Sequence, residues 1–265
     1  MRIIAFDTLD STNLEAQRQW RQARGEGGQE KKREPLLITA RTQHGGLGRS
    51  GRHWLSPAGG LWMSLLWPVR GSLADYQAAP LVAGLATAEA IDEVCGLACQ
   101  IKWPNDLLLE QRKLVGILCQ GELDSSDANE NSGGSAIIIG IGINANFASA
   151  DLGPGLRHPP ISLRDVRERP IHLDELRDAV VQRLVAQLKI LEGSAAAGSF
   201  VTDLRPRIEA RLAWRDQPVL CSDTQGQVLA VGQLAGLTSD GCVVIRTASG
   251  PVTLAVGELQ LRSQP

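Results

Sequence analysis

HGGLGRSGRHWLSPAGG, residues 44–60, is the stretch of the chain that decides the fold. Its glycines match the G-x-G-x-x-G spacing of dinucleotide-binding turns. Such a turn must open a helix whose N-terminus holds a pyrophosphate, whereas Pro57 and the glycine pair after it disfavour a helix here. The stretch is therefore predicted to be a loop between two strands, Leu36–Ala40 and Leu61–Trp67, and a Rossmann turn is excluded.

Other nucleotide-binding motifs are also missing from the sequence. The kinase strings V-A-I-K, H-R-D and D-F-G do not occur, and neither does the P-loop string G-x-x-x-x-G-K-[ST]. The loop can still bind an anion, because glycine-rich backbone exposes N–H groups and Arg49 and Arg52 add bidentate donors for phosphate or carboxylate. The alternative is a charged surface loop without a ligand.

Composition sets limits on the class of protein. The 265 residues include 27 Lys and Arg against 29 Asp and Glu, a formal net charge of -2, so no basic excess indicates nucleic acid or an anionic membrane. The apolar runs are far shorter than the roughly 20 residues of a membrane helix. The five cysteines form no C-x-x-C pair, which is typical of a reduced, cytoplasmic protein without a structural zinc site.

The order of predicted elements indicates a large α+β body followed by a small β domain. Thr12 and Glu15 have capping-box spacing, which predicts a helix that starts at Thr12 as its N-cap. Helices are also predicted over Gln77–Val94 and Leu173–Leu191, and the polar stretch Asp124–Ser135 is predicted to be a hairpin tip. From Gln217 onward, short strands alternate with turn residues, which is typical of a small antiparallel barrel.

Two further segments concentrate polar side chains beside buried strands. The K-W-P-N-D turn at residues 102–106 brings Lys102, Asn105 and Asp106 into a short span that suits a polyanion and its metal ion, although a plain hairpin turn reads the same way. Lys113 begins an apolar strand and provides a fixed positive charge at the edge of a core. Glycines at 140 and 142 interrupt another buried strand, which indicates close approach by a ligand or another backbone.

Five motifs together resemble the biotin protein ligases. They are D-S-T-N at 10–13, the loop from Gln43 to Pro57, K-W-P-N-D at 102–106, K-L-V-G-I-L at 113–118 and G-I-G-I-N at 140–144, in the order seen in that family. The resemblance implies an α+β fold with a mixed, largely antiparallel sheet and helices on one face, followed by an SH3-like β-barrel. We expect the catalytic domain to span 1–211 and the barrel 212–265.

The same resemblance implies the reaction and its residues. The family makes biotinyl-5′-adenylate from biotin and ATP with Mg²⁺, then transfers biotin to one lysine of a carrier domain in a biotin-dependent carboxylase. Lys113 and Arg49 match the catalytic cations, which suits a step that brings two anions together, and Asp106 is the candidate Mg²⁺ ligand. The expected biotin contacts are Ser11, Thr12, Asn13, Gln43, Gly46, Leu47, Gly48, Arg49 and Lys113. The expected ATP and adenylate contacts are Arg49, Arg52, Trp54, Asn105, Asp106 and Asn144. The loop is expected to be mobile when empty and to close over the adenylate.

The chain departs from the family pattern in three places. Leu47 stands where many members have a second arginine, and Gln120 stands where a glutamate is common. Only nine residues precede Asp10, so we expect the monofunctional type, which lacks the DNA-binding domain of repressor members and does not bind DNA. A homodimer is compatible with the resemblance. The alternatives are a lipoate or octanoate protein ligase of the same catalytic fold and a non-catalytic sensor of biotin or its adenylate.

Overall fold

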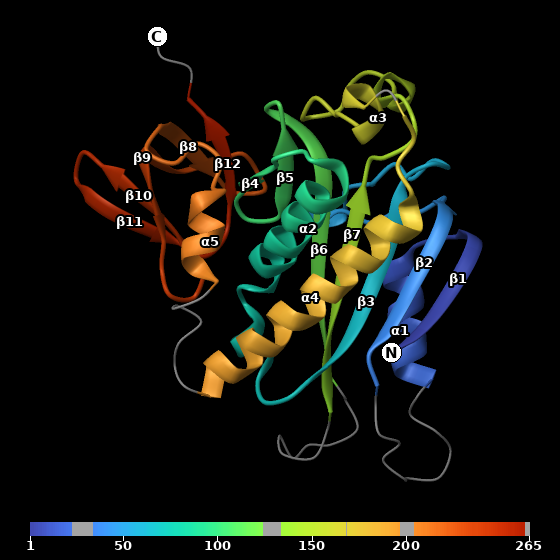
Figure 1. Cartoon of the computed structure of the whole chain (residues 1–265). Coiled ribbons are helices and arrows are strands. Elements are labelled where there is room, and N and C mark those ends of the chain that lie inside the picture. The colour runs from blue at the N-terminus through green and yellow to red at the C-terminus, as the bar shows by residue number, and fades with distance from the viewer. Residues whose placement is uncertain (23–33, 124–133, 168, 197–203, 263–265) are drawn as a thin grey trace. The chain divides into compact units, whose positions relative to one another are not determined.

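The computed structural model of the chain describes residues 1–22, 34–123, 134–167, 169–196 and 204–262. These residues divide into two compact units, one formed by Met1–Tyr76 and Leu114–Arg177, the other by Gln77–Lys113 and Asp178–Pro265 (Figure 1). The expected division into 1–211 and 212–265 stays a prediction.

The sheet of the first unit confirms the mixed, largely antiparallel arrangement. Its strands lie in the order β1-β2-β3-β7-β6, with β1 parallel to β2 and each later neighbour antiparallel. The strands are β1 (Arg2–Leu9), β2 (Leu36–Gln43), β3 (Leu61–Val69), β6 (Arg112–Leu123) and β7 (Ser135–Ile143). All but the last two residues of β3 are buried, so side chains on both of its faces belong to the core.

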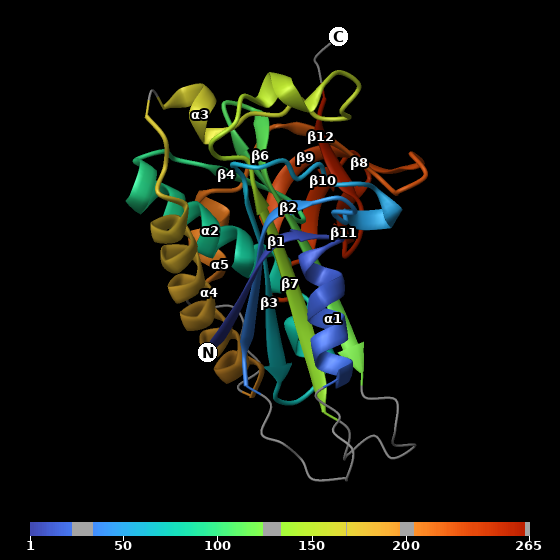
Figure 2. The ribbon, with the colours of Figure 1, turned by 90° about the vertical axis from the view of Figure 1, so that its right-hand side faces the viewer.

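Helix α1 (Thr12–Gln22) packs along this sheet beside β3 and β7 (Figure 2). Its Ala16 and Trp20 are fully or almost fully buried against apolar side chains of β2, β3 and β7, among them Ile38 and Ile138. These contacts fix α1, and with it the turn that precedes it, against the middle of the sheet.

The expected cap of α1 is wrong. Thr12 is already the first helical residue, and its hydroxyl donates to Gln43 Oε1 on β2 instead of closing the helix end. The Glu15 carboxylate accepts from Arg18 and Gln19 in the next turn of the helix. A side chain from another strand thus took the place of the local capping pair, which sequence spacing cannot reveal.

Helices form much of the second unit. α2 (Ala79–Cys95), close to the predicted range, is apolar around most of its circumference and contacts the hairpin β4 (Gln100–Lys102) and β5 (Asp106–Leu109). α4 (Leu173–Ala196) starts at the end of the first unit, and its Gln187 donates to Glu89 of α2. α5 (Arg205–Ala210) packs beside α2 and β9, and Arg207 also donates to Glu89, at 2.8 Å (Figure 1).

The C-terminal strands form an open five-stranded antiparallel sheet. They are β8 (Pro218–Ser222), β9 (Val228–Leu237), β10 (Val243–Thr247), β11 (Gly250–Leu254) and β12 (Glu258–Leu261), in the order β11-β10-β9-β8-β12. This agrees with the expected SH3-like domain, and within the described residues the sheet stays open and does not close into a full barrel. The two edge strands, five and four residues long, lie at opposite ends of the order, and within the described residues the ladder does not join them.

Short helical turns complete the described chain. They are η1 (Arg49–Gly51), η2 (Leu73–Tyr76), η3 (Ser149–Leu152) and α3 (Leu163–Val166). Residues 124–133 of the expected hairpin tip lie outside the described residues. Among the helices that the structure describes, none combines the length and apolar character needed to cross a membrane.

Candidate active site

The site in the first unit is built on Gly140 of β7, a position without a Cβ atom. Gly140 pairs with Ser64 of β3 on one side and Leu118 of β6 on the other. A Cβ atom built on Gly140 would lie 2.1 Å from Asn13 Oδ1, so only glycine lets the Asn13 side chain lie against the strand. A close approach occurs at this glycine as predicted, but the approaching group is a side chain and not the ligand or backbone that we expected.

Asn13 is held at both ends of its amide. Its Nδ2 donates to Gln120 Oε1 at 2.7 Å and to Leu118 O at 3.4 Å, and its Oδ1 accepts from Ser64 Oγ at 2.6 Å. Asn13 is only 4% exposed and Ser64 is completely buried. Because donors and acceptors are both matched, the orientation of this amide is fixed.

Thr12 and Gln43 continue the same set of hydrogen bonds. Gln43 Oε1 accepts from the Thr12 N–H at 2.8 Å and from its hydroxyl at 3.1 Å, and Gln43 Nε2 donates to Ser56 Oγ at 2.7 Å. Ser64 Oγ also lies 2.7 Å from Thr12 Oγ1. We call the residues joined in this way the polar network: Thr12, Asn13, Gln43, Ser56, Ser64 and Gln120. None of them carries a charge.

Two members of the polar network were missed from the sequence. Ser64 lies within the apolar run of β3, and Ser56 precedes Pro57 at the end of the glycine loop. A single serine in a buried strand is the only signal that Ser64 gives, and it does not identify a partner. Thr12, Asn13 and Gln43 were expected at one site, and the structure brings them together.

Ser11 is buried beside the network and is fixed through Asp10. The Ser11 N–H donates to Asp10 Oδ1 at 2.6 Å, and the two Asp10 oxygens accept from Arg18 at 2.8 and 2.9 Å. Asp10 O also accepts the Gly45 N–H at 2.9 Å, which ties this turn to the start of the glycine loop. The Arg18 guanidinium lowers the pKa of Asp10 from 3.8 to about 2.

The glycine loop is a small hairpin. The Trp54 N–H donates to Gly46 O and the Gly48 N–H to Arg52 O, at 2.9 and 2.7 Å. A Cβ on Gly46 would lie 2.3 Å from Trp54 O, so the two arms approach closely because glycine is there. Leu47 forms a bridge with His53. At the tip Ser50 and Gly51 have φ of 56° and 72°, the left-handed region that glycine adopts without cost. Arg49 is half-buried there and Arg52 is exposed.

Trp54 returns from the loop to the sheet. Its indole lies where Cβ atoms would stand on Gly116 and Gly142, which are paired across β6 and β7; such atoms would come within 2.7 and 2.5 Å of the ring. The Trp54 and Trp62 rings form a T-shaped pair, with ring centroids 6.4 Å apart. The three glycines Gly116, Gly140 and Gly142 therefore form a floor on which Asn13 and Trp54 lie.

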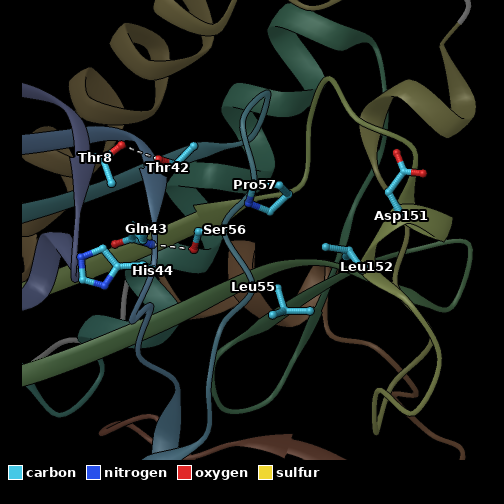
Figure 3. A pocket seen from close by; sticks show the side chains of 9 residues that line it. All are labelled: Thr8, Thr42, Gln43, His44, Leu55, Ser56, Pro57, Asp151 and Leu152. Carbon is cyan, nitrogen blue, oxygen red and sulfur yellow. Dashed lines mark hydrogen bonds between the residues drawn. The ribbon is translucent and has the colours of Figure 1, made fainter.

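An open cavity of about 380 Å³ borders the polar network (Figure 3). Gln43 and Ser56 lie at one side of it, joined by their hydrogen bond, and Leu55, Pro57 and Leu152 give it an apolar part. The remaining lining residues are Thr8, Thr42, His44 and Asp151. The network is thus reached from a mixed polar and apolar surface.

Charged side chains gather in the second unit around the K-W-P-N-D turn. Lys113 Nζ lies 2.7 Å from Asp106 Oδ1, an ion pair in which Asp106 is 7% exposed. Lys102 is 3% exposed, and its Nζ lies 3.6 Å from Glu258 Oε1 on β12. Burial lowers the pKa of Lys102, while Asp106 and Glu258 act in the opposite direction. Asn105 is half-buried in the turn. Asp106 and Lys113 were expected at one site and lie together; Glu258 was missed.

The donor set fits magnesium in one form only. Among the residues that the structure describes, no group of three or more His, Cys, Asp or Glu side chains could enclose a metal ion. Mg²⁺ is commonly held by one or two carboxylates together with substrate phosphates and water. Asp106, a buried carboxylate beside two lysines, matches that arrangement, with the nucleotide supplying the remaining oxygens.

Asn144 is buried and has a structural task in this conformation. Its Nδ2 donates to Ile161 O at 3.0 Å, and its backbone joins Leu114 O and the Leu163 N–H. It thereby fixes the start of α3. An additional adenylate contact by Asn144 stays a prediction.

Comparison with known proteins agrees with this geometry. The model of the biotin/lipoate A/B protein ligase family matches residues 10–144. A biotin–[acetyl-CoA-carboxylase] ligase of Paracoccus denitrificans is 31% identical over 227 residues, which cover 84% of this chain and 88% of that protein. This chain belongs to the biotin protein ligase family.

Other relatives of the ligase match more narrowly or by structure. The bifunctional ligase/repressor BirA of Escherichia coli is 39% identical over 106 residues, 40% of this chain and 31% of that protein. A structure of the Aquifex aeolicus biotin protein ligase in complex with biotin and ATP superimposes with a TM-score of 0.74 at 26% identity, covering 99% of both chains.

A methyl group at Gly142 should displace the loop of the ligase. Gly142→Ala places a Cβ 2.5 Å from the Trp54 indole, so we expect Trp54 to leave the floor and the hairpin to open. Trypsin should then cleave faster at Arg49 and Arg52. Gly193→Ala on α4, where a Cβ meets nothing within 4 Å, is the control. Unchanged cleavage of Gly142→Ala would contradict this packing.

The Asp10–Arg18 pair of the ligase should contribute stability that acid removes. Asp10 has its pKa lowered to about 2, so the contribution is complete above about pH 4 and disappears as the pH falls through 2. Because both groups are partly exposed, Arg18→Met should lower the free energy of unfolding by less than about 1 kcal/mol at pH 7. Urea unfolding at pH 7, 4 and 2.5 should show this difference shrinking with acid.

The control for that series is Arg21→Met, in which the arginine is more exposed than Arg18 and its partner Glu122 lies farther away, at 3.6 Å. A difference for Arg18→Met that stays constant down to pH 2.5 would show that Asp10 is not the group involved.

Proposed function

We propose that this ligase activates biotin with ATP to biotinyl-5′-adenylate, releasing pyrophosphate, and then transfers the biotinyl group to one lysine of a biotin carboxyl carrier domain. The Paracoccus relative is a biotin–[acetyl-CoA-carboxylase] ligase, and the Aquifex ligase was solved with biotin and ATP. The observation that carries the proposal in this chain is the largely buried, uncharged polar network.

The network suits the head group of biotin. The ureido ring is neutral and has two N–H donors and one carbonyl acceptor. Hydroxyl and amide side chains such as Thr12, Ser64 and Gln43 each hold more hydrogen-bonding capacity than one partner uses. Gln43 Nε2, for example, has two N–H groups, and Ser56 takes one of them. A ring of this kind can therefore exchange hydrogen bonds with the network.

The rival acids fit the network poorly. The octanoyl chain has no hydrogen-bonding group near its end, and the dithiolane of lipoate has only weak sulfur acceptors. Polar side chains covered by such a tail lose contact with water without gaining a partner, which costs free energy. Selection against a ligand that leaves buried polar groups unpaired is stronger than selection by shape alone. The network thus favours biotin over the lipoate or octanoate alternative.

The first step joins two anions. A carboxylate oxygen of biotin attacks the α-phosphorus of ATP, a new P–O bond forms, and the bond to the β-phosphate oxygen breaks as pyrophosphate leaves. Fixed cations lower this barrier because they are already oriented where negative charge develops. Lys113 and Arg49 are proposed for this role, Arg49 at the tip of the loop and Lys113 from its pair with Asp106.

The second step uses the nucleophile of the partner. The neutral amine of the carrier lysine attacks the carbonyl carbon of the mixed anhydride, the amide bond forms, AMP leaves, and the amine loses a proton. The chain therefore needs no serine or cysteine nucleophile of its own. The loop, with Trp54 and Arg52, is proposed to cover the adenylate and keep out water before the carrier arrives.

The nucleotide contacts remain part of the proposal. Asn105, Asp106 and Asn144 are proposed on the ATP side. Magnesium bound with ATP supplies positive charge to the phosphates, and Asp106 is the residue that would hold it. A cytoplasmic location and the absence of a DNA partner are likewise proposed from the sequence, which is compatible with a homodimer.

ATP–pyrophosphate exchange tests the function directly. We expect exchange with biotin and none above background with lipoate or octanoate, since only the biotin head group matches the network. Exchange with lipoate or octanoate alone would assign the lipoate-type activity. A folded protein that binds biotin without exchange would favour the sensor. Transfer is checked afterwards by mass spectrometry of a carrier domain.

Lys113→Gln should abolish exchange and leave the fold intact. Its side chain is 22% exposed, so the strand loses little packing, while adenylate formation loses a fixed cation. We expect exchange to fall by roughly 100-fold or more with a melting temperature close to that of the wild type. Arg112→Gln, whose partner Glu110 is exposed, provides the neighbouring control on the same strand, and its exchange should stay near the wild-type rate. Full exchange by Lys113→Gln would remove Lys113 from the catalytic cations.

A further inference from the structure

Trp214 lies in a strained position directly after α5. Its φ is +62°, a left-handed conformation that a tryptophan rarely adopts. The segment that carries it is fixed on β4, because Ile101 donates to Arg211 O at 2.7 Å and accepts from the Ala213 N–H at 2.9 Å. Backbone in this region persists only when the surrounding contacts require it.

The indole contacts two side chains with two different parts of the ring. Lys102 Nζ lies over its face, 5.8 Å from the ring centroid. Its Nε1 donates to Gln111 Oε1 at 2.7 Å. A phenyl ring would keep the first contact and lose the second, and an aliphatic side chain would lose both.

Lys102 and Gln111 lie close in the sequence to the residues that we propose act on the nucleotide. Lys102 ends β4 at the start of the turn that carries Asn105 and Asp106. Gln111 lies in the turn between β5 and β6, where Glu110 and Gln111 have φ of 51° and 60°, two residues before Lys113. Lys113 and Asp106 are themselves paired at 2.7 Å. Trp214 therefore joins both turns that flank β5.

We propose that Trp214 is a positioning residue for adenylate formation: through Lys102 and Gln111 it holds the two turns that present Asp106 and Lys113. The inference rests on the proposed function. Glu258 also holds Lys102, with its Oε1 3.6 Å from the ammonium. The other side-chain partner of Gln111 is Gln100 of β4, at 2.8 Å. Within the described residues, no side chain of the C-terminal sheet therefore supports Gln111 in the way that Glu258 supports Lys102.

The test compares variants in ATP–pyrophosphate exchange, with KM measured for ATP and for biotin. Trp214→Phe should lower kcat/KM for ATP about 10-fold and Trp214→Leu about 100-fold, because small misplacements of reacting groups carry penalties of that order. KM for biotin should change less than kcat/KM for ATP, since the residues of the polar network belong to the other unit. A split of this kind is not produced by loss of stability alone.

A double-mutant cycle identifies the path. Gln111→Leu should resemble Trp214→Phe, and the double variant should be no worse than either single one, because both remove the same hydrogen bond. Gln100→Leu is the matched control, since it removes the hydrogen bond between Gln111 and Gln100 and leaves the hydrogen bond between Gln111 and Trp214. Trp20→Phe, on the buried face of α1, controls for the loss of an indole that reduces stability without touching either turn.

The outcomes separate the two proposals. Absence of exchange by the wild type with every acid overturns the proposed function. Wild-type exchange together with an unchanged kcat/KM for ATP in a folded Trp214→Leu protein overturns the positioning role alone. Equal losses in the ATP and biotin parameters that follow the melting temperature also overturn it. Additive losses in the cycle would refute the path through Gln111.

Discussion

Two successive positions on one face of β7 carry no Cβ atom, and the site in the first unit depends on this constraint. Gly140 leaves space for the Asn13 amide, and Gly142, with Gly116 across the ladder, leaves space for the Trp54 ring. Because side chains alternate along a strand, a shift of register by one residue would turn both gaps to the other face. The long antiparallel pairings of β7 with β3 and β6 exclude that shift, so the sheet register sets where the helix start and the loop can lie.

The start of α1 is completed by that arrangement. The first N–H groups of a helix have no partner within it. Here the Thr12 N–H is satisfied by Gln43 Oε1 from β2, and the Ser11 N–H by Asp10 Oδ1. The residues D-S-T-N therefore do two things at once: they begin a helix and they build a buried hydrogen-bonded surface. A local cap would have used the Thr12 hydroxyl and left Gln43 and Ser64 without it.

How far the sequence predicts this structure depends on the range of each interaction. The strand–loop–strand reading of residues 36–67 is confirmed, because short motifs and strand patterns report on it. The β7 glycines are closely approached as predicted, but by side chains and not by a ligand or another backbone. The capping role of Thr12 is wrong, since the competing acceptor comes from another strand. Ser64, Glu258 and Trp214 were missed because a lone polar or aromatic residue gives no sign of a partner far away in the chain. The open form of the C-terminal sheet could not be predicted, because strand patterns give strand lengths and order, whereas closure depends on whether the two edge strands meet.

The two lysines near the K-W-P-N-D turn differ in a way that bears on the proposed reaction. Lys102 is almost fully buried and contacts Glu258 and the Trp214 ring. Moving its ammonium toward a ligand would take the cation away from a buried carboxylate, which costs free energy. The Lys113 side chain is 22% exposed, and its carboxylate partner, Asp106, is the last residue of the K-W-P-N-D turn. An arriving phosphate can therefore take the Lys113 ammonium as an additional ligand at a smaller desolvation cost. In this division Lys102 keeps the turn in shape, and Lys113 is the lysine that we propose to meet the changing charge of the nucleotide.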